Sequence, residues 1–296
     1  MSKFTYTVQP ADDGYSVRDL IRRNFSFSSR LMTKLKQNDC ICLNDEPVRV
    51  HIIPNPGDTV SISLPEEQSD FTPENIPIFP VFEDNDLLVI NKSAGYIVHP
   101  TKGHYAHTIA NGLAHYIIET KQSFKIRFIN RLDMDTSGLL LIAKNGHCQD
   151  AIVKQMTYNK VTKKYIAVVK GILKDDSGTI NLPIGRIEDR IEREVTPDGH
   201  PSVTHYTVLE RFEKGFSLVE LRLETGRTHQ IRVHLSHIGH PIIGDHLYGG
   251  ENVLLIERQA LHAHFVSFEH PITGNLIELS AELPADMLKL IEKIRT

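Results

Sequence analysis

Several features are scarce or missing in this sequence of 296 residues, and each absence excludes a class of protein. It has no tryptophan and only three cysteines (Cys40, Cys42 and Cys148), an odd number that argues against a disulfide-stapled secreted fold. No apolar run reaches the length of about 18 residues that a membrane helix needs. The first residues also lack the apolar stretch of a signal peptide. We therefore expect a cytoplasmic protein with no membrane partner.

Cofactor signatures are missing as well. The sequence holds no phosphate-cradling glycine loop and no dinucleotide fingerprint, so we expect no nucleotide cofactor. One histidine-rich segment could suggest a metal hydrolase; it contains His229, His234, His237, His240, Asp245 and His246. Its spacing fits no standard zinc site and it has no H-E-x-x-H pair. We favour hydrogen-bonded structural histidines here and predict no metal.

The charge of the chain is distributed unevenly. The net charge is -4, which by itself would argue against a nucleic-acid partner. However, residues 65–90 hold a concentration of Asp and Glu and no Lys or Arg, whereas residues 16–36 and 121–170 are rich in Lys and Arg. Local basic faces bind phosphates whatever the total charge is. An RNA partner therefore stays possible.

A linker is predicted at residues 64–79, which are acidic, contain three prolines and follow no regular period. Residues 1–63 before it form a small α/β module. Ser16 and Ser28 or Ser29 are expected to begin two short helices, and strands are expected at 40–44, 48–52 and 59–64. The helices carry the candidate RNA-binding residues Arg18, Arg22, Arg23, Arg30, Lys34 and Lys36. The alternative is that these cations form ordinary solvated helix faces.

Residues 80–296 read as an α+β domain. Strands are predicted at 86–91, 138–144, 163–171, 203–212, 216–224, 260–271 and 276–283, and helices at 107–118, 145–159 and 228–238. Runs of strands with scattered helices, rather than a βαβ alternation, favour a mixed and mainly antiparallel sheet with flanking helices.

Charged residues stand directly before a predicted buried strand in the segment INRLDMDTSGLLLIAKN (129–145). A carboxylate at the edge of a core, such as Asp133, must be paired with a cation or serve a function. Arg227 is our candidate for the guanidinium that keeps it ionised. An ionised, oriented carboxylate can act as a nucleophile or a proton acceptor. Tyr165, which shares one strand face with Lys163, offers a ring for a nucleobase to stack on. Together these residues indicate an enzyme that acts on a base.

The segment RLDMDTSG (131–138) resembles the signature of RluA-type RNA pseudouridine synthases. GRTHQIRVHLSHIGHPIIGDHLYG, RQALHAHFVSFEHPITG and EDNDLLVINKSAGYIVHP are similar to other blocks of the same family, in the expected order, over residues 80–285. Residues 15–62 resemble the RNA-binding module named after the fourth small-subunit ribosomal protein, as in the RluD-like members.

This resemblance implies an isomerase that converts uridine to pseudouridine in RNA without a cofactor. By motif position Asp133 would be the catalytic aspartate, Arg131 would fill the gap left by the extruded base, Tyr165 would lie against the uracil, and Arg227 would hold Asp133. Members with the N-terminal module commonly act on large-subunit ribosomal RNA. Transfer RNA is the alternative substrate, and a non-catalytic RNA-binding or ribosome assembly factor is the alternative function.

Overall fold

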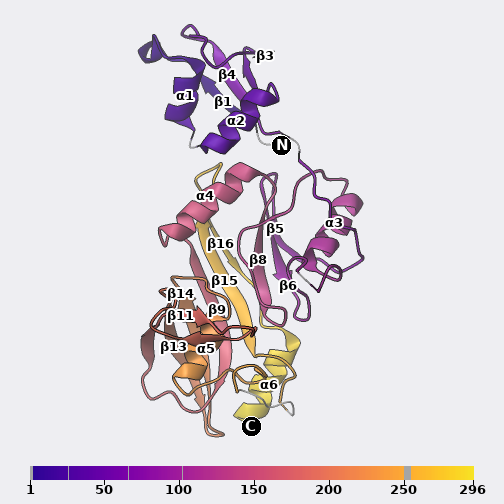
Figure 1. Ribbon diagram of the computed structural model, residues 1–296, viewed down its shortest axis with the longest axis vertical. Helices are drawn as coiled ribbons and strands as arrows, with labels where there is room; N and C mark the ends of the chain where they lie inside the picture. Colours follow the sequence, from indigo (N-terminus) through magenta and orange to yellow (C-terminus); the bar gives the residue numbers. More distant parts are fainter. Residues whose placement is uncertain (1–2, 26, 66, 102, 250–254) are drawn as a thin grey trace.

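The protein is described by a computed structural model that covers residues 3–25, 27–65, 67–101, 103–249 and 255–296. A small N-terminal unit, built around its own hydrophobic core between Val8 and Leu64, lies at one end of a larger body (Figure 1). The described residues 67–79, which connect the two, contain no helix or strand. Within the described ranges no helix combines the length and the apolar character needed to cross a membrane.

Two capped helices pack on a four-stranded sheet in the N-terminal unit. The Ser16 side chain caps α1 and forms a capping box with Asp19, and Ser28 caps α2, as the sequence predicts. Leu20 and Leu35 are among the buried core residues. The elements are β1 (Lys3–Thr7), η1 (Pro10–Asp12), α1 (Val17–Asn24), α2 (Ser29–Gln37), β2 (Ile41–Leu43), β3 (Glu46–Pro47) and β4 (Thr59–Ser63), with sheet order β1-β4-β2-β3.

The strand predicted at residues 48–52 is wrong, because only Glu46–Pro47 is paired as β3. The carbonyls of Val50 and Ile52 instead accept hydrogen bonds from the amides of Arg18 and Val17, both 2.9 Å. The first amides of a helix have no partner within the helix. The carbonyl groups of this segment accept hydrogen bonds from them, so they are not available to pair with a neighbouring strand.

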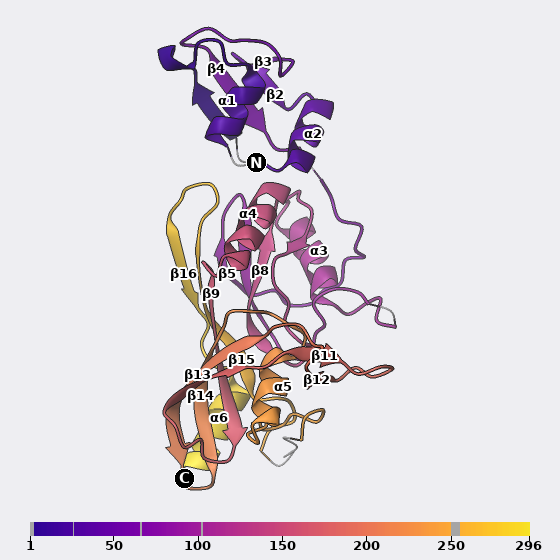
Figure 2. The same ribbon diagram turned by 60° about the vertical axis from the view of Figure 1, so that its left-hand side comes forward.

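The larger body is a mixed sheet with helices on its faces (Figures 1 and 2). Its strand order is β10-β13-β14-β9-β15-β8-β6-β5, with β16 beside β15 and β7 beside β8. All its pairs are antiparallel except β15 with β8. The fold is thus α+β with a mainly antiparallel sheet, as the sequence predicts.

The bounds of the remaining elements follow the chain. The strands are β5 (Pro80–Glu83), β6 (Leu87–Lys92), β7 (Arg127–Phe128), β8 (Ser137–Ala143), β9 (Thr162–Lys170), β10 (Ser177–Asn181), β11 (Ile184–Arg186), β12 (Arg193–Val195), β13 (Val203–Phe212), β14 (Phe216–Leu223), β15 (Leu261–Glu269) and β16 (Leu276–Ser280). The helices are α3 (Ile109–Glu119), α4 (Gly146–Thr157), α5 (Gln230–His237) and α6 (Ala285–Arg295).

The apolar run in β8 is buried on both faces of the sheet. Leu140 and Ile142 pack in the cluster that includes Leu113 of α3, whereas Leu139 and Leu141 pack in the cluster that includes Ile152 of α4. A strand covered on both sides needs apolar residues at every position and not at every second one. The polar loop before β8 is therefore held at the edge of a doubly covered core.

A close approach between β8 and β15 fixes the start of β8. Gly138 has φ +114°, and a Cβ placed there would lie 2.3 Å from the carbonyl oxygen of Ala263. Glycine is required here for two reasons: it adopts this positive φ without strain, and it has no Cβ to collide with Ala263. The parallel pairing of Ala263 with Gly138 thus anchors the chain five residues after Asp133.

Candidate active site

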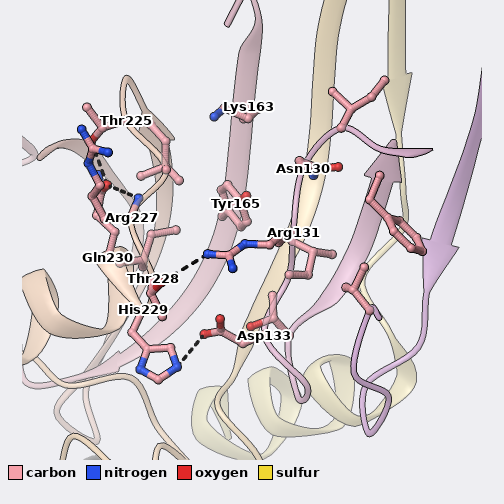
Figure 3. Close-up of a pocket in the computed structure, with 18 of the residues that line it drawn as sticks. Asn130, Arg131, Asp133, Lys163, Tyr165, Thr225, Arg227, Thr228, His229 and Gln230 are labelled. Atoms are coloured by element: carbon pink, nitrogen blue, oxygen red, sulfur yellow. Dashed lines mark hydrogen bonds and ion pairs between the residues drawn. The ribbon is translucent and has the colours of Figure 1, made fainter. Parts of the chain in front are cut away.

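One cavity of about 980 Å³ contains all four residues for which the sequence predicts roles in chemistry and substrate binding. Asp133 and Arg131 come from the loop before β8, Tyr165 from β9, and Arg227 from the loop before α5 (Figure 3). The volume lies near the upper end of the range of about 300–1,000 Å³ typical of ligand sites. Segments far apart in sequence thus supply opposite walls of one pocket.

The expected ion pair between Arg227 and Asp133 is wrong, because Asp133 is held by Arg232. Nη1 of Arg232 donates to Oδ2 of Asp133 at 3.0 Å. Arg227 lies outside this pair and donates from Nε to the carbonyl oxygen of Pro201 at 3.4 Å. Arg227 precedes α5, whereas Arg232 lies within its first turn, on the side that faces the Asp133 loop. The sequence predicts a guanidinium clamp but assigns it to the wrong arginine.

Arg232 is itself fixed by a second carboxylate, Asp245, whose side chain is fully buried. Nε and Nη2 of Arg232 donate to the two oxygens of Asp245 at 2.7 and 2.9 Å. Burial acts to lower the pKa of Arg232, but the hydrogen bonds and charges of Asp245 and Asp133 outweigh it and raise the pKa. The guanidinium therefore stays charged, with a different nitrogen for each contact, and presents Nη1 to Asp133.

Lys92 holds the backbone of the Asp133 loop through hydrogen bonds. Its buried ammonium donates to the carbonyl oxygens of Ser93 at 2.9 Å, Met134 at 2.8 Å and Thr136 at 2.9 Å. Burial lowers the pKa of Lys92 to about 7, while the charges of Asp135 and Asp133 oppose that change. Three acceptors match the three N–H groups that only the ammonium form provides.

Arg258 ties the same loop to the C-terminal helix. Its Nη1 donates to the carbonyl oxygen of Asp135 at 3.0 Å, and its Nε donates to Asp286 of α6 at 2.6 Å. Helix α6 is not among the helices that the sequence predicts. Helix α6 is connected to the site through Arg258. This contact is a second support for the loop that carries Asp133, in addition to Lys92.

Tyr165 presents a buried ring to the cavity. Burial, together with the charge of Asp133, raises the pKa of the Tyr165 phenol, so the ring stays neutral. Arg131, on the opposite wall, donates from Nη2 to Oγ1 of Thr228 at 3.2 Å and bridges the two walls (Figure 3). Lys163 also lines the cavity, so Lys163 and Tyr165 share one face of β9, as strand alternation predicts.

Four of the five histidines in the segment 229–246, namely His229, His234, His240 and His246, take part in hydrogen bonds. His234 contacts Oγ1 of Thr204 and the carbonyl oxygen of Leu182, both at 2.9 Å, and Nδ1 of His229 lies 2.8 Å from the Tyr248 hydroxyl. Nε2 of His229 points toward Asp133 at 3.9 Å. In the part of the chain that the structure covers, no three His, Cys, Asp or Glu side chains gather as metal ligands.

The predicted RNA-binding cations of the N-terminal unit are mostly exposed. Lys34 differs, because it is half-buried and pairs with Glu67 of the connecting segment at 2.7 Å. The guanidinium of Arg23 lies 4.3 Å from the ring centre of Tyr15. Arg18, Arg22, Arg23, Arg30 and Lys36 have exposed side chains. These five can meet a ligand without leaving a buried position.

Four supporting residues, Arg232, Asp245, Lys92 and Arg258, are missing from the sequence-based prediction, although the first three left a signal. Arg232 stands between Ile231 and Val233 in a predicted helix, and Asp245 follows the apolar pair Ile242 and Ile243. Lys92 ends an apolar strand in the same way. A charge set among apolar residues implies a buried partner, which is the rule that singles out Asp133. The same rule, applied to every such position, marks all three residues as buried charges, but it does not say which partner each of them meets.

Comparisons with known proteins agree with this geometry. Residues 86–237 match the sequence profile of the family described as RNA pseudouridylate synthase. The chain is 44% identical over 260 residues to an uncharacterized RNA pseudouridine synthase, YlyB, of Bacillus subtilis, with 86% of each chain covered. It is 42% identical to the ribosomal large subunit pseudouridine synthase D of Haemophilus ducreyi, over 78% of this chain and 75% of that protein.

A solved structure extends the likeness to three dimensions. Human RNA pseudouridylate synthase domain containing 1 superposes with a TM-score of 0.58 at 27% identity, covering 74% of this chain and 95% of that chain. The profile spans about half of the sequence and includes Asp133, Tyr165, Arg227 and Arg232. The chain therefore belongs to the RNA pseudouridylate synthase family.

Proposed function

We propose that this protein converts uridine to pseudouridine in large-subunit ribosomal RNA, in the cytoplasm, with Asp133 as the catalytic residue. The observation that carries the proposal is the oriented carboxylate of Asp133, paired with Arg232 at 3.0 Å in a cavity that also presents the ring of Tyr165. The large-subunit substrate is supported by the names of relatives such as the Haemophilus ducreyi protein.

The proposed reaction is a balanced isomerisation. The bond between N1 of uracil and C1′ of ribose breaks, the uracil turns within the pocket, and its C5 forms a bond with C1′. C5 loses a proton and N1 gains one, so no oxidant, reductant or cofactor is consumed. The free uracil must stay in place while it turns, and stacking on Tyr165, worth about 1–3 kcal/mol for a base, supports that step.

The target base must first leave its stack, at a cost of a few kcal/mol. Arg131 is exposed, and its hydrogen bond to Thr228 joins two of the segments that line the cavity. We propose that Arg131 exchanges this contact for the space that the extruded uridine leaves in the RNA. The guanidinium would then open the pocket and stabilise the distorted RNA in one movement.

A map of pseudouridine in ribosomal and transfer RNA tests the proposal. Cells with and without the gene are compared, and the purified protein is then incubated with RNA from the cells that lack it. Loss of a site in large-subunit RNA, and its return in vitro, is the expected result. Loss confined to transfer RNA would reassign the substrate. Unchanged maps together with no product in vitro would favour the non-catalytic RNA-binding factor.

Lys92→Met is predicted to lower turnover by about tenfold to a hundredfold, because small displacements of a reacting group are costly. It is also predicted to destabilise the fold by about 1–3 kcal/mol, since buried carbonyls lose their donor. Lys144→Met is the matched control. The Lys144 side chain is only 7% exposed, and its ammonium also donates to three acceptors, on Glu83, Asp84 and Gln122, away from Asp133. Denaturant unfolding and turnover of the folded protein are measured.

We expect both lysine variants to lose similar stability and only Lys92→Met to lose turnover. Equal turnover losses would mean that Lys92 serves the fold in general and not the Asp133 loop.

Reversal of Arg18, Arg22 and Lys36 to Glu is predicted to weaken binding of large-subunit RNA and to flatten its salt dependence. Each phosphate that the protein no longer neutralises reduces the slope of log K against log salt by about 0.7–0.9. Lys34 is left unchanged because of its ion pair with Glu67. Reversal of Lys121, Lys174 and Lys289, exposed lysines of the larger body, gives the same change of charge as a control. Equal slopes for the two variants would contradict a docking role for the N-terminal unit.

A further inference from the structure

Lys163 is a cation that lines the active-site cavity but has no role in the reaction proposed above. It lies on β9 two residues before Tyr165, and both side chains line the cavity. Figure 3 draws Lys163 on the far side of Tyr165 from Asp133. The next residue, Lys164, points to the other face of the strand and pairs with Glu220 at 3.0 Å.

The ammonium group of Lys163 differs from the other cations of the cavity, because it has no partner in the described part of the chain. Among the residues that the structure covers, no hydrogen-bond acceptor or carboxylate contacts it. By contrast Arg232 pairs with Asp133, Arg131 donates to Thr228, and Arg227 donates to Pro201. Burial lowers the pKa of Lys163, with no neighbouring charge to oppose it.

The loop before α5, which lies beside Lys163, is fixed in place. A Cβ on Gly226 would lie 3.8 Å from Nζ of Lys163, so the ammonium lies beside this loop. Buried Gln230 holds the loop by accepting from the Arg227 amide at 3.0 Å and donating to the Val203 carbonyl at 3.0 Å. The exposed guanidinium of Arg227 extends from the same loop. Two cations thus line one end of the cavity, and neither pairs with a carboxylate of the described chain.

We propose that Lys163, with Arg227 across from it, binds a phosphate group of the RNA next to the extruded uridine. This inference rests on the proposed function. An ammonium has three donors and no acceptor, and a partly desolvated one gains most from an anion. Residues i and i+2 of a strand are about 7 Å apart, so Lys163 lies beyond the ring of Tyr165 along the strand.

The shape of the cavity favours the backbone of the RNA over its base at this position. Met156 and Thr157 at the end of α4, and Asn159 in the segment that leads into β9, also line the cavity of about 980 Å³, which has room for more than one stacked base. An RNA chain that places its uridine on Tyr165 has a path out of the pocket past Lys163. Glu224 also lines the cavity, but its carboxylate pairs with His205 at 2.7 Å and not with Lys163. The RNA phosphate would supply the anionic partner that Lys163 lacks.

The test is a double-mutant cycle between Lys163 and single phosphates. A short RNA that contains the mapped target uridine is made with one neutral methylphosphonate linkage at a time, on either side of the target, as separated diastereomers. Wild type, Lys163→Met and Lys163→Arg are compared with Lys164→Met as the control. Single-turnover rates at increasing enzyme concentration give the half-saturating concentration and the maximal rate separately, and unfolding curves verify the fold.

We expect Lys163→Met to raise the half-saturating concentration about tenfold or more, the scale of one missing charge-assisted hydrogen bond. Its salt slope should fall by about 0.7. One neutral linkage should impair wild type by a similar factor and have no added effect on Lys163→Met. Lys163→Arg should keep most of the affinity, and Lys164→Met should behave as wild type.

The inference is overturned if no single neutral linkage impairs the wild type, a result that does not depend on the folding of any variant. It is also overturned if Lys163→Met keeps the wild-type salt slope, or if its defect couples to replacement of the uracil O4 atom and not to a linkage. Absence of pseudouridine from wild type with unmodified RNA is a separate result, which would overturn the proposed function itself.

Discussion

Asp133→Asn is expected to abolish pseudouridine formation, lowering turnover by about 10⁴-fold, the scale seen when a catalytic side chain is removed from an enzyme. Asn keeps the size of Asp but has no negative charge, so it can neither attack carbon nor accept a proton as the carboxylate does. RNA binding should persist within a few-fold, because a negative charge near the phosphates is removed and no cation is lost. Turnover and RNA affinity are measured on the same preparation.

Asp135→Asn provides the matched control for this variant. Asp135 lies two residues further along the same loop, and its backbone carbonyl, not its side chain, accepts from Arg258. We expect it to keep turnover within several-fold of wild type. Full turnover by Asp133→Asn would remove the basis for the proposed mechanism. A wild-type protein that binds RNA but forms no product would support the assembly-factor alternative.

The sequence predicted the position of Asp133 well because local patterns determine it. The apolar run of β8 is buried on both faces, so its start, and the polar loop before it, could be located from composition alone. Tyr165 and Lys163 followed from strand alternation in β9. The family resemblance then assigned the roles that composition leaves open.

The partner of Asp133 could not be predicted in the same way. Arg227 and Arg232 lie in one short segment, and which of them reaches Asp133 depends on how α5 begins. His229, the residue before α5, has a left-handed backbone with φ 58°, which is uncommon outside glycine and leaves no periodic signal. The position of Arg232 next to Asp245 likewise depends on a contact across thirteen residues of loop and helix. Such choices are made by tertiary packing.

Arg232→Met is expected to damage stability and catalysis together, through two different carboxylates. It leaves Asp245, whose side chain is fully buried, without its cation, and loss of one partner from a buried pair costs about 3–5 kcal/mol. It also releases Asp133, and loss of one oriented electrostatic interaction lowers turnover by about 10²–10³-fold in other enzymes. Arg232→Lys should fail as well, because a single ammonium cannot reproduce contacts made by three separate nitrogens.

The double variant Arg232→Met with Asp245→Asn separates the two effects. With both charges of the buried pair removed, the free energy of unfolding should return to within about 1–2 kcal/mol of wild type, because no carboxylate is left buried without a cation. Turnover should stay as low as in Arg232→Met, since nothing replaces the contact of 3.0 Å to Asp133. Denaturant unfolding and single-turnover rates are compared for the three proteins. Recovery of turnover along with stability would mean that Arg232 supports the fold alone and that Asp133 needs no guanidinium to act.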